Sequence, residues 1–327
     1  MVEIAHRTIE ANGLRIHFAE AGEGPLVLLC HGWPESWYSL RHQLQALAEA
    51  GCHAVAPDMR GYGETSKPEE VERYTIFHLV GDMVALAAAL SPYKAVIVGH
   101  DWGAPVAWHA ALIRPDRFRG VVGLSVPFRP HGSTRPTSAM PETETSLFYQ
   151  LYFQKPGVAE AELERDPRGS IRRVLYSASG DPPQRSQLMT DDGAPGMVPK
   201  SGGFLTRTID PERLPSWLTE ADVDFYASEF ARAGFRGGLN WYRNIDRNWE
   251  LMAPFAGMRV TIPALYVAGD RDLVVHFKGA AGLIRNLAQF VPDLRRTIML
   301  EGCGHWTQQE RTAEVNAAMI GFLKERG

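Results

Sequence analysis

An aspartate occupies the centre of a short motif that suits a catalytic nucleophile. Residues 98–104 read VGHDWGA, which places Asp101 between Gly99 and Gly103. The strand-like run KAVIV precedes the motif, and the helix-compatible run APVAWHAAL follows it. Many hydrolases hold a nucleophilic serine at the tip of such a strand–turn–helix unit. A helix N-cap would explain the aspartate alone, whereas a tight turn with little room also explains both glycines. We therefore predict that Asp101 is a nucleophile.

Candidates for a base and for its acidic partner follow later strand-like runs. VAGDRDLVV offers Asp270 and Asp272, and EGCGHW offers His305. Nucleophile, acid and histidine in this chain order form a known type of catalytic triad. We assign His305 as the base and Asp272 as the acid that orients it. Asp270 is the alternative acid, although its position after Gly269 also suits a turn-forming residue.

A carboxylate nucleophile favours a particular reaction. Because the side chain of aspartate ordinarily has a pKa of ~3.9, it is already ionised at neutral pH and needs no base to attack. Attack on a carbonyl would give a reactive anhydride, whereas attack on an sp³ carbon gives an ester on the enzyme. His305 could then activate the water that hydrolyses this ester, and Asp272 could stabilise the imidazolium. The residues therefore predict a substrate with an epoxide oxygen or a halide on an sp³ carbon.

The ester's tetrahedral intermediate and the leaving oxygen each need hydrogen-bond donors. For the intermediate we predict an oxyanion hole from the backbone N–H groups of Trp33, in HGWP, and of Trp102. Pro34 has no N–H and is interpreted as fixing the turn. An epoxide leaves as a basic alkoxide, which tyrosine, with a pKa of ~10, can protonate. Tyrosines occur in SLFYQLYFQKPG and in FRGGLNWYRN.

The elements that must position these residues alternate along both ends of the chain. The predicted strands are a hairpin around Asn12–Gly13 and the runs 25–30, 53–58, 94–98, 120–127, 262–270 and 296–302. The predicted helices are 36–50, 74–90, 104–112 and 313–325. This alternation indicates a mostly parallel central sheet with helices on both faces and right-handed crossovers.

The alternation stops near Phe128, which indicates an insertion. We predict an α/β fold of the α/β-hydrolase type, with a core domain formed by residues 1–128 and 251–327. Residues 129–250 form an inserted helical lid, or cap domain, after the sixth strand. The lid is expected to cover the edge of the sheet where parallel strands end, which is where open α/β sheets bind ligands.

Composition excludes several other functions. The 327 residues are 45% hydrophobic and 22% charged, with a net charge of −4, which argues against nucleic acid or an anionic membrane as the partner. We see no signal peptide and no run of ~18 apolar residues, so no membrane insertion is expected. The three scattered cysteines, Cys30, Cys52 and Cys303, suit a reducing cytoplasm. No histidine or cysteine spacing suits a metal, so we expect neither a metal nor another cofactor.

Several segments together resemble the soluble epoxide hydrolases. They are HGWPESWYSLRHQ, DMRGYGETS, VGHDWGA, FYQLYFQKPGVAEAELE, GFRGGLNWYRN and GCGHWTQ. The resemblance runs from Arg15 to the last helix and is close to the hydrolase half of the mammalian soluble enzyme. It implies conversion of a small lipophilic epoxide and water to a vicinal diol through an aspartyl ester, as a detoxification reaction in a monomer or homodimer. The phosphatase domain of the mammalian enzyme is not represented, so no phosphatase activity is expected.

The resemblance also implies roles for residues of the lid. The family's pair of acidic tyrosines matches Tyr149 and Tyr242, with Tyr152 as the competitor for the first position. HGW replaces the commoner HGF, a change expected on the pocket wall. The residues predicted to line the substrate pocket are Trp33, Pro34, Trp102, Phe148, Gln150 and Leu151.

Two other functions compete with this interpretation. HGxP and GHDWG also occur among haloalkane dehalogenases, which use the same type of nucleophile, but the lid tyrosines favour an epoxide. A catalytically silent receptor of hydrolase fold is the second alternative. Such a protein is expected to lack part of the machinery, whereas every part has a match in this sequence.

Overall fold

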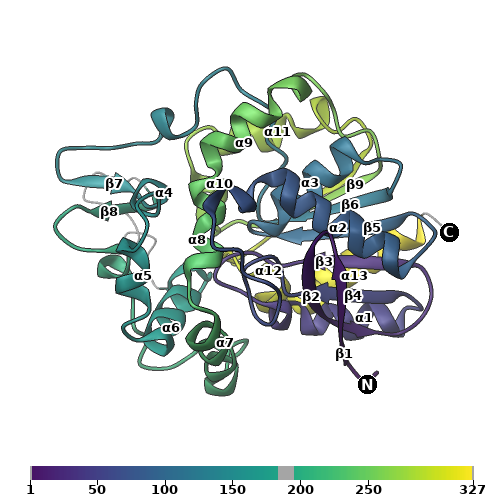
Figure 1. Cartoon of the computed structure of the whole chain (residues 1–327), viewed down its shortest axis with the longest axis horizontal. Coiled ribbons are helices and arrows are strands. Elements are labelled where there is room, and N and C mark those ends of the chain that lie inside the picture. The colour runs from purple at the N-terminus through teal and green to yellow at the C-terminus, as the bar shows by residue number, and fades with distance from the viewer. Residues whose placement is uncertain (1, 183–194, 326–327) are drawn as a thin grey trace.

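An eight-stranded sheet forms the centre of the fold (Figure 1). The computed structural model describes residues 2–182 and 195–325. The strand order is β1-β2-β4-β3-β5-β6-β9-β10. The strands are β1 (Ala5–Ala11), β2 (Leu14–Ala21), β3 (Leu26–Cys30), β4 (His53–Pro57), β5 (Ala95–His100), β6 (Phe118–Leu124), β9 (Ala264–Gly269) and β10 (Leu294–Leu300). All neighbours from β4 to β10 pair in parallel, and β2 pairs with β1 and β4 in antiparallel. The predicted mostly parallel sheet is confirmed.

The antiparallel edge begins with the hairpin that the sequence predicted. Asn12 and Gly13 lie between β1 and β2 with φ angles of 52° and 72°. Two successive residues of positive φ match the right-handed twist of the flanking strands, and Asn-Gly is the dipeptide that best tolerates this conformation. Ala11 pairs with Leu14, so the turn has two residues.

Helices cover both faces of the sheet, as expected. They are α1 (Arg41–Glu49) and α13 (Thr312–Lys324) on one face, and α2 (Ile76–Leu90) and α3 (Gly103–Ile113) on the other. The central strand β3 alternates between them: Leu28 packs in the core with α2 and α3, while Val27 and Leu29 pack in the core with α1. Each fully buried side chain of this size contributes about 1.5–3 kcal/mol. Burial on both faces explains why β3 reads as a continuous apolar run.

The described residues of the segment 129–250 follow β6 and lie mainly to one side of the sheet, on the left in Figure 1. The α-helices that begin in this segment are α4 (Tyr149–Tyr152), α5 (Val158–Leu163), α6 (Pro167–Ala178), α7 (Glu220–Ala233), α8 (Arg236–Arg243) and α9 (Ile245–Met252). One feature was not predicted: β7 (Ser146–Phe148) and β8 (Met197–Pro199) form a small antiparallel sheet. Strands of three residues are too short to show a periodicity. The limits 129–250 of this cap remain a prediction.

The cap is fixed to the core by polar and aromatic contacts of α7. Asp222 caps this helix together with Thr219, and its carboxylate also accepts hydrogen bonds from Tyr38 Oη and Arg41 Nη2, each at 2.9 Å. The ring of Phe225 stacks on Tyr38 at 4.0 Å. Within the residues described, no helix has both the length and the apolar composition needed to cross a membrane.

Candidate active site

Asp101 lies on a sharp turn between β5 and α3. β5 ends at His100 and α3 begins at Gly103, and between them Asp101 adopts a φ of 49°. This left-handed conformation costs a non-glycine residue about 1–2 kcal/mol, and such strain collects at functional sites. The turn projects the carboxylate beyond the end of the strand, as the motif predicted.

The two glycines of the motif are required by close backbone contacts. A Cβ on Gly99 would lie 2.0 Å from the carbonyl oxygen of Gly103. A Cβ on Gly103 would lie 2.1 Å from the carbonyl oxygen of Cys30, at the end of β3. Both distances are impossible for a side chain, so the prediction that lack of room selects these glycines is confirmed.

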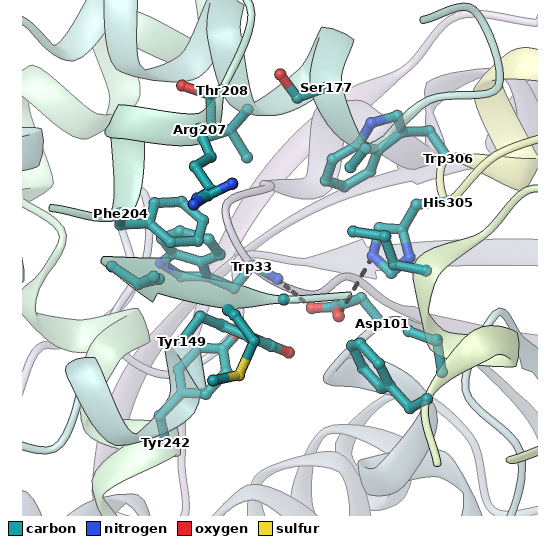
Figure 2. A pocket seen from close by; sticks show the side chains of 18 residues that line it. Trp33, Asp101, Tyr149, Ser177, Phe204, Arg207, Thr208, Tyr242, His305 and Trp306 are labelled. Atoms are coloured by element: carbon teal, nitrogen blue, oxygen red, sulfur yellow. Dashed lines mark hydrogen bonds and ion pairs between the residues drawn. The ribbon is translucent and has the colours of Figure 1, made fainter. Parts of the chain in front are cut away.

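The two carboxylate oxygens of Asp101 have different surroundings (Figure 2). Oδ1 accepts a hydrogen bond of 2.7 Å from the backbone N–H of Trp33. Oδ2 lies 3.4 Å from Nε2 of His305. Trp102 immediately precedes α3, so its N–H belongs to the helix N-terminus, where amides lack partners within the helix. The two predicted oxyanion donors thus lie on the loops beside the carboxylate.

His305 contacts the acid on the side of its ring away from Asp101. Its Nδ1 lies 3.0 Å from Oδ1 of Asp272. Asp272 follows β9, is completely buried, and accepts a hydrogen bond from the backbone N–H of Val274 in α10 (Leu273–His276). Of the two acids considered, Asp272 is therefore the one that contacts the histidine. Asp270 accepts a hydrogen bond from the Gly302 amide instead.

The charges of this group shift its pKa values in opposite directions. Burial lowers the pKa of His305, but the Asp272 and Asp101 carboxylates outweigh it and raise that pKa well above its usual value. Burial raises the pKa of Asp272, but His305 and the Ser125 hydroxyl outweigh it and hold that pKa below its usual value. The histidine next to an ionised Asp101 is therefore readily protonated.

Tyr149 and Tyr242 lie next to each other on the cap side of the cavity in Figure 2, across from Asp101 and His305. Tyr149 begins α4 and Tyr242 lies in α8, and their ring centroids are 5.9 Å apart. Burial, followed by the nearby Asp101 charge, raises the pKa of both phenols. Both therefore carry a proton at neutral pH. Tyr152, the alternative to Tyr149, donates to Glu162 at 2.8 Å and does not line the cavity.

A cavity of about 110 Å³ joins Asp101 to these tyrosines. Its walls are mostly apolar, and the cap and the segments that follow β9 and β10 supply most of the lining residues. The lining residues are Trp33, Asp101, Tyr149, Val174, Ser177, Ala178, Gly196, Met197, Val198, Phe204, Arg207, Thr208, Tyr242, Leu273, Val274, Phe277, His305 and Trp306.

The cavity includes one of the six residues predicted for the pocket wall. Trp33 lines the cavity, but the other five predicted residues do not: Pro34, Trp102, Phe148, Gln150 and Leu151. Neighbours in a helix or strand point in different directions, so a segment that aims Tyr149 at the cavity does not bring every adjacent side chain to the cavity wall. Gln150 contacts a residue of the cavity wall, because its Nε2 donates to Tyr149 Oη at 3.0 Å. Trp102 packs edge-on against Tyr242, with centroids 5.2 Å apart.

Most of the wall residues that the sequence did not reveal come from α6, β8 and the 3-10 helix Phe204–Arg207. They carry no motif and reach the cavity only through the fold of the cap. The cap also contacts the loop of the histidine. The His305 N–H donates to the Ala178 carbonyl at 2.9 Å, and Trp306 Nε1 donates to the Leu175 carbonyl at 2.6 Å.

A buried pair behind the site was also missed. His100 Nε2 donates to the carbonyl oxygen of His305 at 2.7 Å, and its Nδ1 lies 2.8 Å from Oε2 of Glu35. The same Glu35 oxygen accepts from the Gly32 N–H at 2.7 Å. The pair therefore links the loop of Trp33 to the loop of His305. The sequence could have indicated this pair, because Glu35 lies in the HGWPE motif and His100 lies in the GHD motif.

Together the fold and the site define a class, the proteins of α/β-hydrolase fold with an aspartate at the position of the nucleophile. A family model described as alpha/beta hydrolase fold matches residues 25–312. Epoxide hydrolase A of Mycobacterium tuberculosis is 44% identical over 97% of this chain and 96% of its own. Bifunctional epoxide hydrolase 2 of Sus scrofa is 40% identical over 95% of this chain and 54% of its own.

A solved structure agrees with these relatives. Epoxide hydrolase A from Mycobacterium thermoresistibile superposes with a TM-score of 0.90 and 46% identity, covering 98% of each chain. This chain therefore belongs to the epoxide hydrolase family and is an epoxide hydrolase enzyme. Within the described parts of the chain, no group of three or more His, Cys, Asp or Glu side chains is arranged to hold a metal ion.

Proposed function

We propose that this enzyme converts an epoxide and water into a vicinal diol through a covalent ester on Asp101. The observation that carries the proposal is the asymmetry of the Asp101 carboxylate, whose Oδ1 accepts from the Trp33 amide while Oδ2 faces His305. The apolar lining of the cavity favours a small lipophilic epoxide. The three unpaired cysteines suit a cytoplasmic enzyme, and removal of reactive epoxides suits a detoxifying role.

In the first step, Oδ2 of Asp101 attacks an epoxide carbon, and the bond from that carbon to the ring oxygen breaks. The electron pair moves to the ring oxygen, which takes a proton from Tyr149 or Tyr242. Both phenols are suitable donors, because burial and the Asp101 charge keep them protonated. The product of this step is a hydroxyalkyl ester of Asp101. No base is needed, because the carboxylate is already ionised.

In the second step, Nε2 of His305 takes a proton from water, and the hydroxide bonds to Cγ of Asp101. The negative charge that develops on Oδ1 is stabilised by the N–H groups of Trp33 and Trp102. The Cγ–Oδ2 bond then breaks, and the imidazolium protonates the departing diol oxygen. The new carboxylic acid loses its proton, which balances the proton that the tyrosine gave up.

The electrostatics of the site support these separate roles of Asp101 as the nucleophile and His305 as the base. His305 is readily protonated next to an ionised Asp101. Ester formation removes that negative charge, so the imidazole becomes easier to deprotonate when a base is required. Asp272 stays ionised throughout and stabilises the imidazolium.

The variant His305→Gln tests the proposal. With styrene oxide the wild type should release the diol, whereas the variant should react once and accumulate a protein heavier by one substrate in intact mass spectrometry. His276→Gln is a matched control, because His276 is exposed, donates from Nε2 to the Asp270 carbonyl at 2.8 Å and does not line the cavity. An unmodified His305→Gln protein, or halide release from 1-bromobutane in place of diol formation, would contradict the proposal.

A further inference from the structure

The hydroxyl of Ser125 contacts both Asp272 and His305. Its Oγ donates a hydrogen bond of 2.5 Å to Oδ2 of Asp272. The same oxygen lies 3.0 Å from Nδ1 of His305, the distance that also separates Nδ1 from Oδ1 of Asp272. The hydroxyl can therefore accept from the imidazole N–H while it donates to the carboxylate. Ser125 is completely buried, so this arrangement is shielded from solvent.

The backbone of Ser125 is held in a conformation that serine rarely adopts. Its φ is 70°, in the left-handed region that glycine occupies without steric cost. Two contacts with β9 impose this geometry: the Ser125 N–H donates to the Val267 carbonyl at 2.8 Å, and Tyr266 Oη donates to the Ser125 carbonyl at 2.7 Å. Glycine would fit the turn at the end of β6 with less strain. The hydroxyl is what serine provides there and glycine does not.

We propose that Ser125 is a positioning residue for hydrolysis of the Asp101 ester. It acts through Asp272 and His305 and does not touch the substrate, because it is not among the residues that line the described cavity. This inference rests on the proposed function, since it assigns Ser125 to the second step of that reaction.

The hydrogen bonds of Asp272 explain why the hydroxyl matters. Oδ1 accepts from His305 and from the Val274 amide, whereas Oδ2 accepts from the Ser125 hydroxyl. A buried carboxylate oxygen without a donor is unfavourable, so loss of Oγ would draw the carboxylate or the imidazole away from their present positions. His305 would then aim Nε2 less accurately at the water beside Asp101. The attack of Asp101 on the epoxide needs no base and is independent of this alignment.

Two variants separate the hydroxyl from the backbone. Ser125→Ala and Ser125→Gly both remove Oγ, but glycine relieves the strain at positive φ, so the glycine variant should melt at the higher temperature of the two. With styrene oxide, rapid quenching and intact mass spectrometry give the rates of ester formation and ester loss. Both variants should form the ester at the wild-type rate and hydrolyse it more slowly, on the order of ten- to one-hundred-fold. Ser170→Ala is the control, because Ser170 is a buried serine of α6 that donates to the Leu163 carbonyl away from the triad.

The outcomes are distinct. Equal slowing of ester loss in the two variants, despite different melting temperatures, supports the role of the hydroxyl. Wild-type ester loss in the glycine variant overturns it, because the effect of alanine would then be one of strain alone. Wild-type ester loss in both variants also overturns it. If the wild-type enzyme forms no ester, the proposed function itself is refuted. The wild type alone gives that result, so it is distinct from any effect of the Ser125 variants.

Discussion

The backbone N–H of Trp33 and the carboxylate of Asp101 form a hydrogen bond of 2.7 Å between residues 68 positions apart. The loop after β3 thereby holds one oxygen of the carboxylate before any substrate arrives. The other oxygen is left to face His305 and the cavity. A preorganised donor of this kind acts most strongly on charge that develops during the reaction.

The close approach of this loop to α3 predicts a large difference between two glycine substitutions. Gly103→Ala places a Cβ 2.1 Å from the Cys30 carbonyl oxygen, so it should lower the free energy of unfolding by about 1–3 kcal/mol. Gly282→Ala, in α11 (Ala280–Arg285), meets no atom within 4 Å. It should raise stability by about 0.5–1 kcal/mol, because alanine loses less backbone entropy. Chemical denaturation of both variants measures this, and equal stabilities would contradict the packing argument.

The paired cap tyrosines predict a loss of ring opening when both phenols are removed. Tyr149→Phe and Tyr242→Phe should each slow ester formation, and the double variant should lose the whole benefit of acid catalysis, typically ~10²–10⁴-fold. Single-turnover formation of the alkylated protein is the measurement. Tyr152→Phe serves as the control, because its hydroxyl donates to Glu162 and it does not line the cavity. A double variant that alkylates at the wild-type rate would show that the proton comes from elsewhere.

Ester formation should lower the pKa of His305. In the free enzyme the Asp272 and Asp101 carboxylates raise this pKa, and His100 lies beside the ring with centroids 4.9 Å apart. The ester keeps Asp272 and His100 but neutralises Asp101. His305 must be neutral to accept a proton, so ester hydrolysis should speed up as pH rises through its pKa. That kinetic pKa should lie below the one that NMR titration of the free enzyme gives for His305. Equal values would mean that Asp101 has no influence on the imidazole.

The sequence predicted the parts of the molecule that depend on local chemistry. The turn at Asn12–Gly13, the apolar strands and the crowded glycines around Asp101 each follow from the residues themselves. It also favoured Asp272 over Asp270, because Asp270 follows Gly269 and suits a turn, and the structure brings Asp272 to the histidine.

The other features of the site depend on how segments that are far apart in the sequence pack together. Ser125 belongs to the apolar run GVVGLSVP, and only the packing of β6 beside β9 brings its hydroxyl to Asp272. Phe204 and Val174 line the cavity through the fold of the cap, whereas Phe148, next to a motif tyrosine, is not among the lining residues. Proximity in sequence to a motif was therefore a poor guide to the pocket wall, because one segment can aim only some of its side chains at the cavity.

The source of the new oxygen in the diol distinguishes the two-step route from direct hydrolysis. In the alternative, Asp101 acts as a general base and delivers water straight to the epoxide. With enzyme in excess over styrene oxide in heavy-oxygen water, the two-step route should give mostly unlabelled diol, because the added oxygen is Oδ2 of Asp101. The label should appear in the peptide that carries Asp101, since solvent oxygen replaces Oδ2 at Cγ. Over many turnovers the diol should then become labelled. Fully labelled diol in the first turnover, with no label in the peptide, would exclude the ester. The Trp33 amide favours the two-step route, because a donor at 2.7 Å from Oδ1 is most useful when the carboxyl carbon becomes tetrahedral and that oxygen takes the full negative charge.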